Sequence, residues 1–223
     1  MSPALPAFAF ATLGLCLAPP ERVVRSISSA EAPPADTTYY TLKDSLHAFR
    51  FALTEAPGKC KALFVDIRPA TGTAPVQHVD LGGMGIHCPT SDGRLFAIEV
   101  KDLDFDGIPD FRLMRADTDP RIPGYRYWLH NVRQRAYVAC PALDSIQHPN
   151  FDQDHRLVGS QWSRRPGLRG SSTFRFSEGR LIMMANMEKY TESDHERWVI
   201  WGMKDGVLQP VEERTMPLPE KKP

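Results

Sequence analysis

Hydrophobic and polar residues alternate in short runs along most of this chain, which is the pattern of β-strands with one buried face. Aromatic and β-branched residues fill these runs, whereas hydrophobic residues at helical spacing are scarce. The alternation is clearest on the two sides of the acidic stretch that follows residue 101. We expect the core to receive five alternate positions there: Phe96, Ile98, Val100, Phe111 and Leu113.

The runs predict a succession of short strands separated by turns. Turn sequences with Asp-Gly or Glu-Gly recur between them, at the spacing expected of antiparallel sheets. The predicted strands cover residues 37–42, 48–53, 61–67, 75–81, 95–100, 110–115, 125–131, 136–140, 156–162, 172–178, 180–187, 197–203 and 207–213.

The fold class that follows is all-β, an antiparallel β-sandwich or a curved meander. The chain has 223 residues, of which 42% are hydrophobic, and this is enough to bury one core. We expect a single β domain over residues 39–215, followed by a loose tail over residues 216–223.

The amino-terminal segment resembles an export signal. An apolar run over residues 4–18 is followed by small residues around Ala30, which predicts a signal peptide over residues 1–30 and a flexible lead-in over residues 31–38. No Lys or Arg precedes the apolar run, which departs from the usual signal. The sequence around Cys16 fits a lipoprotein signal poorly. A periplasmic location is therefore the expectation.

Charge excludes one class of partner. With 27 basic and 27 acidic residues, the chain has no basic field that would attract nucleic acid. No later apolar run is long enough to cross a bilayer, so a membrane-spanning protein is not expected.

Three cysteines follow the predicted signal peptide. In an oxidising compartment Cys60 and Cys88 would bridge two predicted strands and leave Cys140 over. Three buried free thiols are the alternative. The spacing of these cysteines matches no zinc motif.

Four aspartates crowd the turn between two predicted strands, at Asp102, Asp104, Asp106 and Asp110. In the register of a calcium loop they occupy positions 1, 3, 5 and 9, with Gly107 at position 6. The sequence therefore predicts Ca²⁺ bound by Asp102, Asp104, Asp106, the carbonyl of Ile108 and Asp110. The alternative is a solvated acidic turn. An EF-hand fits less well, because its position 12 would be Leu113.

No motif for catalysis is present. The sequence lacks a nucleophile elbow, a His-Glu-x-x-His zinc motif, a glycine-rich phosphate loop and a Cys-His signature. The histidines are scattered singly. We therefore expect no enzymatic activity, although two distant carboxylates could still form a glycosidase site.

The order of motifs from Val76 to Met184 resembles a bacterial family of exported β proteins with an FG-GAP or VCBS-like calcium turn. The resemblance is carried by "IEVKDLDFDGIPDFRLM", "YRYWLHNVRQRAYV", "PNFDQDHRLVGSQW" and "STFRFSEGRLIMM". It implies a fold similar to periplasmic lysozyme inhibitors. It further implies a periplasmic immunity protein that inhibits a lysozyme-like peptidoglycan hydrolase delivered by a type IV secretion system.

An inhibitor of that kind would bind through a loop, and residues 160–172 are the best candidate. Trp and Arg are favoured interface anchors, and a basic loop suits an acidic catalytic cleft. The predicted partner-binding residues are Trp162, Arg164, Arg165 and Arg169. The alternative is a solvated hairpin with Trp162 tucked into the core. Residues 121–128 are a second candidate on the same terms.

Two other functions remain open from the sequence alone. A calcium-stabilised adhesion or carbohydrate-binding module would show glycan binding without a hydrolase partner. A metal-stabilised envelope protein would have structural partners only.

Overall fold

The computed structural model describes residues 34–56, 59–71, 77–88, 97–118, 123–192 and 194–218. These residues form fourteen strands and one short helix, so the all-β prediction is confirmed. Every strand pairs antiparallel with its neighbours, and the chain is a meander divided into three sheets. The predicted signal peptide, residues 1–30, lies outside the described residues, as do the last five residues of the predicted tail.

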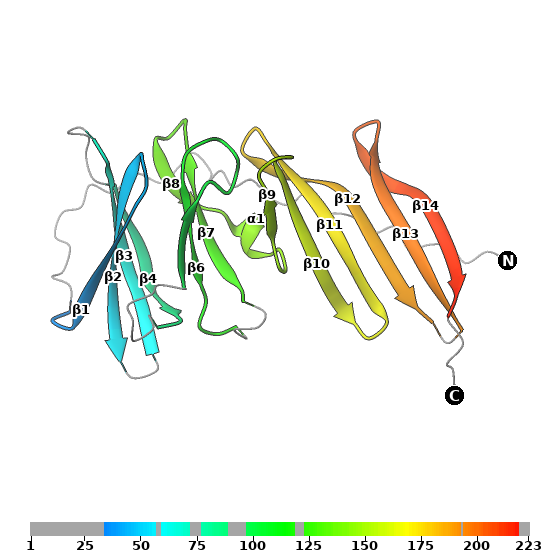
Figure 1. The fold of residues 1–223 in the computed structure, drawn as a ribbon, viewed down its shortest axis with the longest axis horizontal. Coiled ribbons are helices and arrows are strands. Elements are labelled where there is room, and N and C mark those ends of the chain that lie inside the picture. Colours follow the sequence, from blue (N-terminus) through cyan, green and yellow to red (C-terminus); the bar gives the residue numbers. More distant parts are fainter. Residues whose placement is uncertain are drawn as a thin grey trace.

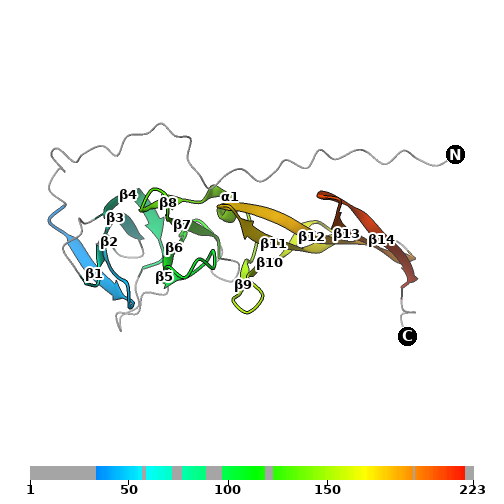
Figure 2. The same ribbon diagram turned by 90° about the horizontal axis from the view of Figure 1, so that it is seen from above.

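The three sheets follow one another along the long axis of the molecule (Figures 1 and 2). The first sheet contains β1 (Thr37–Lys43), β2 (His47–Ala56), β3 (Lys59–Pro69) and β4 (Gln77–Ile86). The middle sheet contains β5 (Ile98–Lys101), β6 (Asp110–Met114), β7 (Tyr125–Asn131) and β8 (Ala136–Ala139). Helix α1 (Pro141–Asp144) then leads to the outer sheet of β9 (Asn150–Asp152), β10 (Leu157–Arg165), β11 (Leu168–Ser177), β12 (Arg180–Thr191), β13 (His195–Lys204) and β14 (Val207–Pro217).

The middle sheet is covered on both faces. Trp128 of β7 belongs to the core cluster shared with the first sheet, and its ring stacks on Phe111 at a centroid distance of 4.9 Å. The adjacent Tyr127 and Leu129 belong to a second cluster, which they share with residues of α1 and of β10, β11 and β12 in the outer sheet. Burial of both faces explains why β7 is rich in large apolar side chains instead of alternating with polar ones.

The core positions expected from alternation are largely confirmed. Ile98, Phe111 and Leu113 are buried, and the half-buried Val100 packs against the first cluster. Phe96 lies outside the described residues. Alternation therefore identified the face of the middle sheet that meets the first sheet.

Several elements differ from the prediction: β11 begins four residues earlier than expected, and β12 and β14 each end four residues later. Strand β4 continues five residues beyond the predicted end, through Gly82 and Gly83, both at positive φ. Glycine runs usually break strands, but here the register shifts between Ala62 and Phe64 of β3 and pairing resumes. The short strand β9 and helix α1 were not predicted, because three- and four-residue elements carry too little periodicity.

The cysteines are all engaged. Cys60 and Cys88 form a disulfide with a Cα–Cα distance of 5.1 Å, which ties β3 to the end of β4. Cys140 is also disulfide-bonded. The prediction of a leftover Cys140 was therefore wrong, and so was the alternative of free thiols.

Candidate functional site

The loop that joins β5 to β6 alternates apolar and acidic side chains. Leu103 and Phe105 are buried and belong to the second core cluster. Asp102, Asp104 and Asp106 alternate with them in sequence; Asp102 and Asp104 are half-buried and Asp106 is exposed. Packing of the apolar residues therefore positions the three carboxylates.

The three carboxylates converge. Each offers an oxygen, and these oxygens lie within 4.8 Å of one another. The loop is also closed by its own side chains. Asp102 accepts hydrogen bonds from the backbone N–H groups of Phe105 at 2.8 Å and Gly107 at 3.0 Å, which stand at φ 67° and 89°. Asp106 accepts one from the N–H of Ile108 at 2.7 Å.

Backbone N–H groups of the loop donate hydrogen bonds to these three carboxylates. In the described part of the chain no Lys or Arg forms an ion pair with these aspartates. Burial, together with the charges of Asp106 and Asp102, raises the pKa of Asp104 to about 7. Burial likewise raises the pKa of Asp106. A hard divalent cation with oxygen ligands would remove this repulsion, and the donor set fits calcium.

Asp110 is placed differently from the other three. It is 0% exposed, and it is not a member of the converging group. Oδ2 accepts hydrogen bonds from the N–H of Leu103 at 2.8 Å and of Asp104 at 3.3 Å, and Oδ1 accepts one from the N–H of His130 at 2.7 Å. Burial, with the charge of Asp104, raises its pKa well above the usual value. Asp110 thus binds backbone rather than facing the cluster.

The loop is held against the outer sheet and against another strand of its own sheet. Gln153, in the turn between β9 and β10, donates from Nε2 to the carbonyl of Asp102 at 2.8 Å. The Tyr137 hydroxyl of β8 donates to the carbonyl of Pro109 at 2.9 Å. Ordering of the loop is therefore coupled to the packing of the middle and outer sheets.

The predicted binding loop, residues 160–172, is mostly strand, because β10 ends at Arg165 and β11 begins at Leu168. The predicted partner-binding residues therefore lie on the hairpin of β10 and β11. Arg164, Arg165 and Arg169 are exposed. None of them forms an ion pair in the described part of the chain, although acidic residues are as numerous as basic ones overall. The guanidinium of Arg164 lies 4.8 Å from the centroid of the Trp162 ring. The hairpin therefore presents uncompensated positive charge.

Trp162 does not protrude from this hairpin. It is half-buried, and its Nε1 donates to the hydroxyl of Ser172 at 2.9 Å. The ring also occupies the space beside Gly170, where an added Cβ would lie 2.4 Å from it. The alternative of Trp162 tucked into the core holds only in part: the cross-strand glycine leaves room for the ring to lie against the sheet, but Trp162 belongs to neither core cluster.

The second candidate, residues 121–128, is unsuited to partner binding in its strand portion. Tyr127 and Trp128 are buried in β7, and the Tyr125 ring lies 4.1 Å beneath the guanidinium of Arg112. Residues 121 and 122 lie outside the described ranges. The aromatic residues of this stretch serve the core.

A buried polar chain crosses the outer sheet and was not predicted. Ser172 donates to Oδ1 of Asn186 at 2.8 Å, and Asn186 donates to Glu188 at 3.2 Å. The Tyr190 hydroxyl donates to the other oxygen of Glu188 at 2.5 Å. The only signal in the sequence is that Asn186, Glu188 and Tyr190 are two residues apart, which places them on one face.

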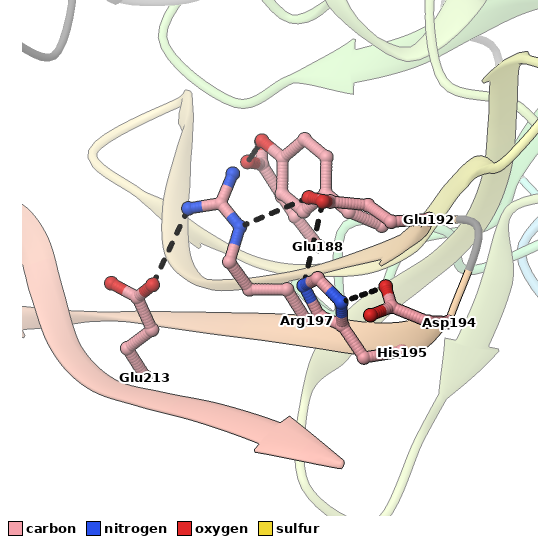
Figure 3. A network of polar contacts seen from close by, with 7 residues as sticks. Glu188, Glu192, Asp194, His195, Arg197 and Glu213 are labelled. Atoms are coloured by element: carbon pink, nitrogen blue, oxygen red, sulfur yellow. Dashed lines mark hydrogen bonds and ion pairs between the residues drawn. The ribbon is translucent and has the colours of Figure 1, made fainter. Parts of the chain in front are cut away.

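The far end of the outer sheet is joined by ion pairs (Figure 3). Arg197 of β13 reaches Glu213 of β14 at 3.3 Å and Glu192 at 3.9 Å. His195 lies between two carboxylates, 2.7 Å from Asp194 and 3.4 Å from Glu192. In the described part of the chain, β13 and β14 contribute no residue to either core cluster. These contacts therefore cross-link β13 and β14 in a part of the sheet that lies outside both core clusters.

The fold is shared with a known structure. A search of solved structures finds a Xanthomonas type IV secretion system related protein with a TM-score of 0.59 and 15% sequence identity. The match covers 82% of this chain and 97% of that one. No protein-family model matches the chain, and no curated protein sequence matches it. Among the described residues, no helix has the length and apolar character needed to span a membrane.

Proposed function

We propose that this protein is a periplasmic, calcium-braced immunity protein that binds and inhibits a lysozyme-like peptidoglycan hydrolase and has no catalytic activity of its own. The observation that carries the proposal is the β10–β11 hairpin, whose three arginines lack acidic partners in the described part of the chain. Support also comes from the family resemblance of residues 76–184 and from the fold shared with a type IV secretion related protein.

The chemistry of the proposed target explains the charge of the hairpin. Glycoside hydrolases of this kind hold two carboxylic acids at the bond that they cleave. An arginine inserted there forms a charge-assisted, bidentate hydrogen bond where the substrate would bind. Arg165 and Arg169 are the arginines free to do so, whereas Arg164 is shared with the Trp162 ring.

Calcium would serve the fold and not the inhibition. We propose Asp102, Asp104 and Asp106 as the carboxylate ligands, with the carbonyl of Ile108. Asp110, which the sequence placed among the ligands, is proposed to hold the loop through its backbone contacts. The ion would neutralise the acidic cluster and so fix the loop between the middle and outer sheets.

The proposal is tested by titrating purified protein into a lysozyme-like hydrolase encoded beside it, with peptidoglycan as substrate. We expect stoichiometric inhibition, and no release of fragments by the protein alone. Changing Arg164, Arg165 and Arg169 together to Ala should weaken inhibition at least tenfold, because buried charged contacts at interfaces are each worth about 1–3 kcal/mol. The matched control changes Arg68, Arg175 and Arg180 to Ala, three other exposed arginines, and should inhibit normally.

Two results would overturn the proposal. Absence of inhibition by the wild-type protein would remove the immunity function, and binding to isolated glycan strands would then favour a carbohydrate-binding module. Full inhibition by the triple variant of Arg164, Arg165 and Arg169 would show that the hairpin arginines do not contact the hydrolase.

A further inference from the structure

Strand β10 is only partly covered on its outer side. Strand β9 pairs with Leu157, Val158 and Gly159 and then ends. In the described part of the chain no strand lies beyond the rest of β10, residues 160–165, and Figure 1 shows β10 extending past β9. Half of the backbone N–H and C=O groups of such a segment point away from the sheet and lack ladder partners. Residue 147 lies beside the start of the segment, where the Ser160 hydroxyl donates to its carbonyl at 2.6 Å.

The other edge of the same sheet differs. Strand β14 carries Pro210 and Pro217, and its register shifts opposite Ile200 and Trp201. Prolines, bulges and charged residues are features that keep an edge from accepting another strand. Residues 160–165 also contain a register shift, between Ser163 and Arg165, and two arginines, but they contain no proline. Proline is therefore the block that β14 has and the outer edge of β10 lacks.

A groove of about 720 Å³ adjoins this part of β10. Its volume lies within the range of sites that bind ligands. The residues that line it include Gln147, Gln161, Trp162, Arg169, Met187 and Lys189. No acidic residue is among them. Lys189 is neutralised by Glu196 at 2.6 Å, but Arg169 has no such partner in the described part of the chain.

We propose that residues 160–165 of β10 bind an extended acidic segment of a partner protein as an added strand. The backbone of the segment would continue the sheet beyond the end of β9. Its carboxylates would face Arg169 in the groove and Arg165 at the hairpin tip. A glycan fits less well, because it offers no regular series of amides to match an open strand edge. This inference goes beyond the proposed function, since it requires neither a hydrolase nor a catalytic cleft.

The test uses synthetic ten-residue peptides of alternating Glu and Thr, with blocked ends, and calorimetric titration of the full chain. The alternating peptide should bind, and the same peptide with Gln in place of Glu should bind roughly tenfold more weakly. Two further peptides carry N-methyl groups on alternate amides, in the two possible registers. Only one edge of an added strand contacts the sheet, so one register should lose binding at least tenfold and the other should keep it.

Protein variants provide the second arm. The double variant Arg165→Gln with Arg169→Gln should bind the acidic peptide about tenfold more weakly than wild type does. It should bind the Gln peptide with the wild-type affinity. The control, Arg175→Gln with Arg180→Gln, alters two exposed arginines outside the groove and should have no effect. Equal binding of the two N-methylated peptides would show that charge attraction alone holds them, without backbone hydrogen bonds. That result would overturn the proposal of an added strand. No binding of the acidic peptide, or binding of an oligogalacturonate instead, would also overturn the proposal.

Discussion

The carboxylate of Asp110 accepts a hydrogen bond from the backbone N–H of His130 at 2.7 Å, which joins the first residue of β6 to β7. Its other oxygen accepts hydrogen bonds from the acidic loop. One buried side chain therefore holds the loop and the middle sheet together, independently of any metal.

Replacing Asp110 should destabilise the protein strongly. Asp110→Ala leaves three backbone N–H groups without their acceptor, and the free energy of unfolding should fall by about 3 kcal/mol or more. Asp110→Asn keeps the shape but turns an NH₂ group toward one set of N–H donors, so it should cost about 2 kcal/mol. Urea unfolding measures both. Asp117→Asn, at an exposed ion pair, is the control and should stay within about 0.5 kcal/mol of wild type. A wild-type stability for Asp110→Asn would contradict this role.

Calcium should stabilise the wild-type protein and not the double variant Asp104→Asn with Asp106→Asn. Mass action predicts about 2.7 kcal/mol at a hundred times the dissociation constant. In chelator the double variant should be more stable than the wild-type protein. Burial and mutual repulsion disfavour the ionised carboxylates, and the double variant lacks two of them.

Thermal unfolding with calcium and with chelator measures both signs. The control is Asp154→Asn with Asp205→Asn, which alters two exposed carboxylates outside the loop and should follow wild type. If the wild-type protein has the same unfolding temperature with calcium as with chelator, the loop binds no calcium.

The Cys60–Cys88 bridge should contribute markedly to stability. It joins residues 28 positions apart. A bridge of that span restricts the unfolded chain, so changing both cysteines to Ser should lower the free energy of unfolding by roughly 3–4 kcal/mol. Denaturant titration of the double variant measures the loss, and peptide mapping without reductant should recover residues 60 and 88 in one linked fragment. Recovery of both as free thiols would refute the bridge.

Gly170 should tolerate no side chain. An added Cβ would lie 2.2 Å from the carbonyl oxygen of Met187 and 2.4 Å from the Trp162 ring. Gly170→Ala should therefore cost about 1–3 kcal/mol by overpacking, and it should shift Trp162 fluorescence. Gly159→Ala is the matched control on β10, since its added Cβ would meet its nearest neighbour, the carbonyl of Asn150, at 3.8 Å. Equal stability of the two variants would show that both the Trp162 ring and the backbone at Met187 can move aside.

Short-range patterns were sufficient for much of the fold. Alternation located most strands, and the hairpin turn at Glu178 and Gly179 has both residues at positive φ, as its sequence indicates. The convergence of Asp102, Asp104 and Asp106 was also expected, because alternate positions in one short loop are a local property; calcium binding there stays a prediction. The predicted range of β4 ended too early, because the glycines at 82 and 83 weaken the strand signal. In the structure the pairing with β3 continues beyond them.

The sequence by itself determined the all-β class, most of the strands and the cluster of Asp102, Asp104 and Asp106, because each depends on residues within a few positions. Tertiary structure alone decided that Asp110 accepts hydrogen bonds from backbone N–H groups and that Trp162 lies against Gly170. It also decided that β10 extends beyond the end of β9. Each of these depends on where strands end relative to their neighbours and on which side chains share a buried face. Such pairings bring together residues that are distant in sequence, and no local pattern encodes them.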